Sequence, residues 1–161
     1  MWYSQPLPIL RELIGDSDAS TYSDFRLQAV LLSAGHLLLR EVSFDNDYVI
    51  NIGASSILPD PSSPEDVSFI NLLALRGAVL VTGSEWKSGA SQAIVIKDGP
   101  STIDTSKGAD ALKERAQWVL DLYTNAKNQY VSGNSIGSCI VSGPIGYWGT
   151  GYRGYYNYKR I

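Results

Sequence analysis

The sequence contains one cysteine, Cys139, and one histidine, His36, among its 161 residues. A single cysteine excludes a disulfide within the chain and a thiolate metal cluster, and it is consistent with a reducing compartment. His36 has no second imidazole with which to form a metal site or a proton relay, and we expect it to be buried in an apolar helix with a structural role. We therefore expect no cofactor and no bound metal.

Long hydrophobic runs are also missing. The N-terminal segment MWYSQPLPIL has neither a basic start nor a long apolar centre, so no signal peptide is predicted. No stretch of about 18 uninterrupted apolar residues occurs, and no membrane span is expected. With 44% apolar and 18% charged residues, the chain has the composition of one folded domain.

Negative charge is absent from the end of the chain. Residues 1–70 hold ten acidic residues against three arginines, whereas residues 143–161 hold Arg153, Lys159 and Arg160 with no acid. The formal net charge is only -3. An acidic body with a basic tail favours self-association or docking over nucleic-acid binding, which requires a basic face.

The acidic segment FDNDY does not fit a calcium loop. Counted from Asp45, the sixth and twelfth positions should be glycine and glutamate, but they are Ile50 and Ser56. A turn in which Asp45 and Asp47 are solvated is the better interpretation.

Two other segments fail as catalytic motifs. GSEWKSGAS, which starts at Gly83, lacks the spacing of a phosphate-binding loop and is interpreted as a helix end and loop. Cys139 would need a neighbouring base to act as a nucleophile, and the one histidine lies in another helix. We find no constellation that indicates an enzyme, and none is expected.

Hydrophobic periodicity predicts four helices, at about residues 8–14, 24–42, 64–86 and 106–132. Ser23 or Asp24 is expected to cap the second, and Ser63 with Pro64 to open the third. The third is apolar on nearly all sides and is expected to form the centre of the core.

Two β elements are expected between these helices. A short strand is predicted at residues 48–52, and the runs AIVI and STID on either side of DGP predict an irregular hairpin near residues 92–104. The predicted fold is thus mainly α: a small bundle of about four helices with a short β-hairpin excursion. The predicted helical domain covers residues 1–133, and residues 134–161 form an extended C-terminal arm.

The arm ends in GPIGYWGTGYRGYYNYKRI, which has five glycines and six aromatic residues. This stretch is too rich in glycine for a helix and too aromatic for an ordinary disordered tail. Tyrosine, tryptophan and arginine are enriched at protein interfaces. We expect the rings to be covered by another chain, with folding back onto the chain's own domain as the alternative.

Several segments together resemble the head–tail adaptor (connector) family of tailed bacteriophages. They are LRELIGD, YSDFRLQAVLLSAGHLLLREVSFDNDYVIN, LPDP, FINLLALRGAVLVTG, IKDGPSTIDT and the YVSGN that ends the last helix, spread over residues 7–145. The resemblance depends most on IKDGPSTIDT and FDNDY, and none of these motifs is catalytic.

The resemblance implies a structural virion protein of the phage neck, present in the host cytoplasm during assembly. Adaptors of this family form a ring, a dodecamer in the virion, that joins the portal to the next connector or tail protein and extends the DNA channel. DNA passes through without sequence-specific binding. The family's fold is a helical bundle with a β element between its last two long helices, and its C-terminal arm reaches the portal.

Two sets of contact residues follow from this resemblance. The arm residues expected to bind the portal are Tyr147, Trp148, Tyr152, Arg153, Tyr155, Tyr156, Tyr158, Lys159 and Arg160. The hairpin residues expected to contact another subunit or the tail side are Ile94, Ile96, Asp98, Pro100 and Ile103.

Two alternatives remain open. One is another neck component, either a tail-proximal connector or a tail terminator, although a terminator should contain more strand. The other is a small bacterial enzyme or regulatory binding module, which would need a pocket with convergent polar groups.

Overall fold

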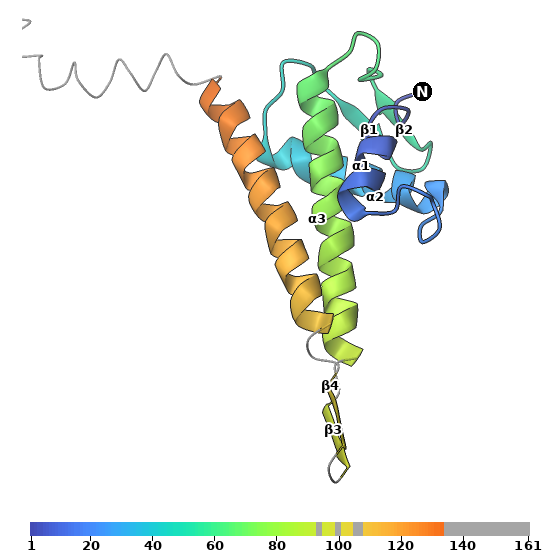
Figure 1. Ribbon diagram of the computed structural model, residues 1–161. Coiled ribbons are helices and arrows are strands. Elements are labelled where there is room, and N and C mark those ends of the chain that lie inside the picture. Colours follow the sequence, from blue (N-terminus) through green and yellow to red (C-terminus); the bar gives the residue numbers. More distant parts are fainter. Residues whose placement is uncertain (93–94, 99–100, 105–107, 134–161) are drawn as a thin grey trace, which may run out of the picture. The chain divides into compact units, whose positions relative to one another are not determined.

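The computed structural model describes residues 1–92, 95–98, 101–104 and 108–133, and in this part the chain is mainly helical with four helices (Figure 1). The chain divides into two compact units, Met1–Lys127 and Asn128–Ile161. The elements are α1 (Pro6–Ile14), α2 (Asp24–Glu41), β1 (Val49–Asn51), β2 (Ser56–Leu58), α3 (Val67–Gln92), β3 (Val95–Asp98), β4 (Ser101–Asp104) and a last helix described over residues 108–133.

Helix α1 ends at residue 14 as predicted but begins at Pro6, two residues before the predicted start, and α2 begins at Asp24 directly after its predicted cap. Gly15 follows α1 in the left-handed conformation, with φ of 66°, which glycine adopts without steric cost. Ser23 is the N-cap of α2, and its hydroxyl accepts a hydrogen bond from the backbone N–H of Arg26. Both caps are local in sequence, which explains why they could be predicted.

The start and end of α3 differ from the prediction. The helix begins at Val67, and Asp66 is its cap, because its carboxylate accepts a hydrogen bond of 2.9 Å from the N–H of Phe69. Ser63 and Pro64 lie before the helix, so their predicted capping role is wrong. The helix also continues to Gln92, which places the segment that starts at Gly83 within the helix and not in a loop.

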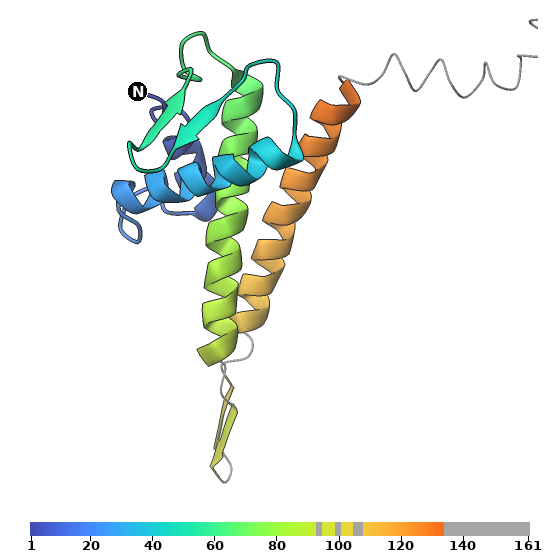
Figure 2. The same cartoon turned by 180° about the vertical axis from the view of Figure 1, so that it is seen from behind.

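Helix α3 forms the centre of the core, as its composition predicted. Phe69, Leu73, Ala74 and Ala78 have no exposed surface. Helices α1 and α2 pack against its first half, and α2 crosses it in Figure 2. The last helix contributes Val119 and Tyr123, which are 0% and 2% exposed.

The hairpin β1–β2 packs one face against α2. Ile50 and Ile57 are antiparallel partners and are both buried. The side chain of Ile50 reaches Gly35 on α2, where an added Cβ would overlap Ile50 Cδ1 and lie 3.3 Å from Leu73 Cδ1. A side chain at position 35 would therefore force the end of the Ile50 side chain to shift. The strand β1 was predicted, and β2 was not.

The second hairpin, β3–β4, lies between α3 and the last helix in sequence, as predicted. Its strands are antiparallel, with Ile96 opposite Ile103 and Asp98 opposite Ser101. A two-stranded hairpin of this length is marginally stable alone.

Replacing Gly35 by alanine should lower the free energy of unfolding, because the displacement of Ile50 by overpacking costs about 1 to 3 kcal/mol and offsets the gain of about 1 kcal/mol in helix propensity. Urea denaturation would measure the change. The control is Gly83→Ala on α3, where an added Cβ meets nothing within 4 Å. That variant should be more stable by about 1 kcal/mol, from helix propensity alone. Equal effects of the two substitutions would mean that the hairpin does not lie against α2.

Candidate interaction surfaces

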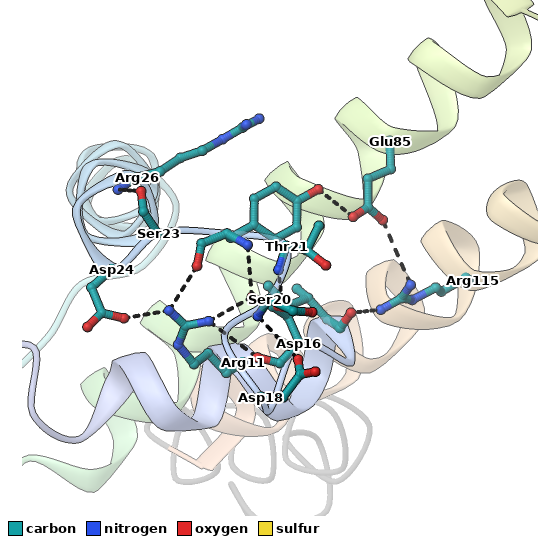
Figure 3. A network of polar contacts seen from close by, with 12 residues as sticks. Arg11, Asp16, Asp18, Ser20, Thr21, Ser23, Asp24, Arg26, Glu85 and Arg115 are labelled. Carbon is teal, nitrogen blue, oxygen red and sulfur yellow. Dashed lines mark hydrogen bonds and ion pairs between the residues drawn. The ribbon is translucent and has the colours of Figure 1, made fainter.

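A buried arginine holds together the segment between α1 and α2 (Figure 3). The guanidinium of Arg11 donates to the carboxylates of Asp16 at 2.6 Å and Asp24 at 2.5 Å, and to the carbonyl oxygen of Tyr22 at 3.0 Å. Arg11 is 7% exposed and Asp16 is 2% exposed. A buried charge needs such pairing, so this loop has one preferred conformation.

The Asp16 carboxylate is also held by the backbone. It accepts hydrogen bonds from the N–H groups of Thr21 at 2.8 Å and Tyr22 at 3.1 Å. The hydrogen bond from Thr21 is the largest influence on the pKa of Asp16, and together with Tyr22 and the charge of Arg11 it outweighs burial and lowers that pKa. The ionised form is therefore the one that the fold stabilises.

A second polar contact joins this loop to α3 and the last helix. The hydroxyl of Tyr22 donates to Glu85 at 2.5 Å, and Arg115 lies 3.8 Å from the same carboxylate (Figure 3). Arg115 also donates to the carbonyl oxygen of Ile14 at the end of α1. Burial, followed by the hydrogen bond to Glu85, raises the pKa of Tyr22 to about 12. These contacts fix the last helix against α1 and α3.

Glu41, at the end of α2, makes polar contacts with the C-terminal half of the last helix and with α3. Its carboxylate accepts a hydrogen bond of 2.6 Å from the hydroxyl of Tyr123, pairs with Arg76 at 2.7 Å and lies 3.4 Å from Lys127 Nζ. Burial alone would raise the pKa of Glu41, but the hydrogen bond from Tyr123 and the two positive charges outweigh it and lower the pKa. Glu41 therefore joins α2, α3 and the last helix.

Two grooves run side by side along the second half of α3. The first groove lies between α3 and the last helix, and the second between α3 and α2. We call them the α3 grooves; the first is lined by Val79, Gly83, Trp86, Lys113, Ala116, Gln117 and Leu120, and the second by Arg26, Ala29, Val30, Ser33, Leu80, Val81 and Ser84.

The floor of the α3 grooves is apolar and exposed. Trp86 and Leu120 are 36% and 39% exposed. The first groove has a cavity volume of about 170 Å³, which is small against the roughly 300 to 1,000 Å³ of typical small-molecule sites. The first groove is therefore too small for a typical metabolite, whereas the second, at about 350 Å³, lies within that range.

A second apolar surface lies on the outer face of the hairpin β1–β2. Val49 and Leu58 are antiparallel partners, and they are 64% and 61% exposed. Ile52, directly after β1, is 56% exposed. We call Val49 and Leu58 the hairpin patch. Sequence analysis identified neither this patch nor the α3 grooves.

The predicted contact residues are described only in part. The arm residues, from Tyr147 to Arg160, lie outside the described residues, as do Ile94 and Pro100. For Ile96, Asp98 and Ile103 the described part is the backbone of β3 and β4. The predicted portal and subunit contacts of these residues therefore remain predictions.

The expectation that His36 is buried is wrong. The residue is exposed on α2, in line with Ser33 and Arg40, which are exposed as well. Asp45 and Asp47 are exposed, and the described residues contain no group of three or more potential metal ligands. Cys139 lies outside the described part of the chain.

Helix α3 is long and apolar enough to cross a membrane by length and composition, since the segment Val67–Ser91 has a mean hydropathy of 1.5. However, 56% of this window is buried inside the protein. The central position of α3 in the core accounts for its composition.

Tyr123→Phe should lower the free energy of unfolding by about 1.5 to 3 kcal/mol, because it removes a hydrogen bond to a charged carboxylate and leaves Glu41 less well satisfied. Urea denaturation would measure the difference. Tyr3→Phe is the matched control, because its hydroxyl bonds only to the Met1 sulfur at an exposed site, and it should change stability little.

Asp16→Asn should destabilise the protein at pH 7, with a difference from wild type that shrinks as the pH falls below about 4. Folding lowers the pKa of Asp16. The ionised carboxylate therefore stabilises the folded protein at pH values above the pKa of Asp16 in the unfolded chain. This stabilisation is lost as the pH falls through the pKa of Asp16 in the folded protein. Thermal unfolding from pH 7 to pH 2 would test this, with the exposed Glu12→Gln as a charge control. A difference that does not change with pH would contradict it.

Comparison of the chain with protein-family models, with curated proteins and with solved structures returns no match.

Proposed function

We propose that this protein is a structural component of a bacteriophage neck: an adaptor that forms a ring between the portal and the next connector or tail protein. The proposal originates in the resemblance of IKDGPSTIDT, FDNDY and the other segments named above. It involves no catalysis and no cofactor. In this role the ring extends the DNA channel, and the C-terminal arm attaches it to the portal.

The observation that best supports the proposal is the position of the hairpin β3–β4. It interrupts the chain between α3 and the last helix, which are the two longest helices of the described residues. The resemblance implies this order of elements. A hairpin inserted between two long antiparallel helices is suited to contacting a neighbour, because two strands alone are marginally stable.

The tail provides the second line of support. The fully buried residues of the described part run from Pro6 to Tyr123, so they form a core well before the aromatic tail begins. Six rings among residues 143–161 represent a large apolar area that gains from being covered. In this proposal the portal covers them, and interface arginine and tyrosine act as anchors.

Replacing the tail aromatics by serine (Tyr147, Trp148, Tyr152, Tyr155, Tyr156 and Tyr158) should weaken binding to the portal ring by at least about 100-fold, since several anchors are lost. Pull-down and titration with the purified portal of the same phage would measure this. The circular-dichroism signal of the helices should stay unchanged.

The matched control replaces Arg153, Lys159 and Arg160 by glutamine and keeps every ring. It should bind more weakly mainly at low salt, because it removes only electrostatic attraction. If the serine variant binds the portal like wild type, the proposed role of the tail is wrong. If it loses helical structure, the rings belong to the chain's own core. Binding to a tail-tube protein but not to a portal would favour the tail-proximal connector.

A further inference from the structure

The last helix is attached to the rest of the protein by few buried side chains. Within residues 108–127, the part of this helix that belongs to the first unit, only Val119 and Tyr123 are buried. Helix α1 has nine residues and buries four of them, and α2 has 18 residues and buries six. Burial of apolar surface is the main force that holds an element in place, so the last helix gains less from packing per residue than α1 or α2.

The other helices have a core of their own. Leu10 on α1, Leu31 on α2 and Phe69 on α3 are fully buried, and α1 and α2 pack against the first half of α3 (Figure 1). The buried ion pair of Arg11 with Asp16, at 2.6 Å, also involves no residue of the last helix. The part of the chain from α1 to the first half of α3 therefore contains its own apolar core and its own buried charges.

The two carboxylates that the last helix contacts each have a second partner outside that helix. Glu41 on α2 pairs with Arg76 on α3 at 2.7 Å. Glu85 on α3 accepts a hydrogen bond of 2.5 Å from the hydroxyl of Tyr22. Loss of the partner of a buried charge is strongly unfavourable, but both carboxylates keep these partners when the last helix leaves.

Two buried polar atoms beside the last helix have no hydrogen bond. They are Arg76 Nε and Glu85 Oε2, which find no hydrogen-bond partner among the described residues. The guanidinium carbon of Arg76 lies 5.2 Å from the ring centre of Tyr123, and Arg115 is 3.8 Å from Glu85 Oε2, too far for a hydrogen bond. A buried polar atom without a hydrogen bond carries a desolvation cost. Access of water to these two atoms would remove this cost, and so movement of the last helix relieves it.

We infer that residues 108–127 form a clasp, a helical segment that opens away from α3 as one unit while α1, α2, the hairpin β1–β2 and the first half of α3 stay folded. Proteins open in such units with free energies below that of global unfolding. Opening uncovers the side of α3 that carries Val79, Gly83 and Trp86, which line the first groove. The inference is independent of the proposed function, because it concerns the free chain alone.

Native-state hydrogen exchange of the full-length chain, followed by NMR, tests the clasp. Amides of residues 112–127 should exchange at least about 10-fold faster than the slowest amides in the first half of α3. Their exchange should also accelerate less steeply with added urea, because opening of the clasp exposes less surface than global unfolding.

Two substitutions distinguish the clasp from the core. Ile57→Val, in the hairpin that packs on α2, should accelerate exchange of the slowest core amides about 2- to 10-fold. It should leave residues 112–127 unchanged, because the hairpin stays packed when the clasp is open. Tyr123→Phe should accelerate exchange of residues 112–127 at least about 10-fold, because the hydrogen bond to Glu41 is broken in the open state. Tyr3→Phe removes an exposed hydroxyl and should change neither region.

Three outcomes would overturn the inference. Equal acceleration of both regions by Ile57→Val would mean that the last helix and the core unfold as one cooperative unit. Exchange of residues 112–127 as slow as that of the core would mean the same. If Tyr123→Phe leaves these amides unchanged, they exchange by local fraying that does not break the contact with Glu41, and no clasp opens.

Discussion

A helix that is apolar on nearly every face must be covered on every side, and α3 imposes this constraint on the rest of the molecule. Its first half satisfies the constraint within the chain, because α1 and α2 lie against it and the hairpin β1–β2 packs its inner face on α2. Its second half, from Val79 onward, packs against the last helix and is flanked by the α3 grooves. The same composition that builds the core therefore also creates the surface that remains uncovered.

Polar contacts determine how these helices are oriented. Hydrophobic packing has little directional preference, whereas a buried ion pair tolerates few arrangements. Arg11 fixes the loop that joins α1 to α2, and Glu41 receives hydrogen bonds or charge from α3 and the last helix. The contact of Arg115 with Glu85 lies toward the start of the last helix and that of Tyr123 with Glu41 toward its end. Two well-separated contacts of this kind restrict rotation and sliding of the last helix along α3.

Local signals explain which parts of the fold could be predicted from the sequence. Gly15 and Ser23 act within one helical turn, and so the end of α1 and the start of α2 could be predicted, whereas α1 begins two residues before its predicted start. The start of α3 could not, because Ser63 and Asp66 are both good caps. A tertiary contact distinguishes them, since the hydroxyl of Tyr48 donates to Asp66 at 2.8 Å. Strand β2 is three residues long and gives no periodicity, and only the burial of Ile57 reveals it.

The exposed side of α2 could have been predicted but was missed. His36 lies in an apolar run, and that run suggested burial. However, Ser33, His36 and Arg40 follow one another at helical spacing and are all exposed, so they form a polar stripe. Trp86 and Leu120 show the same difficulty, because apolar residues at helical spacing look like core residues, yet both are exposed. A sequence does not tell whether the partner that covers such residues belongs to the same chain.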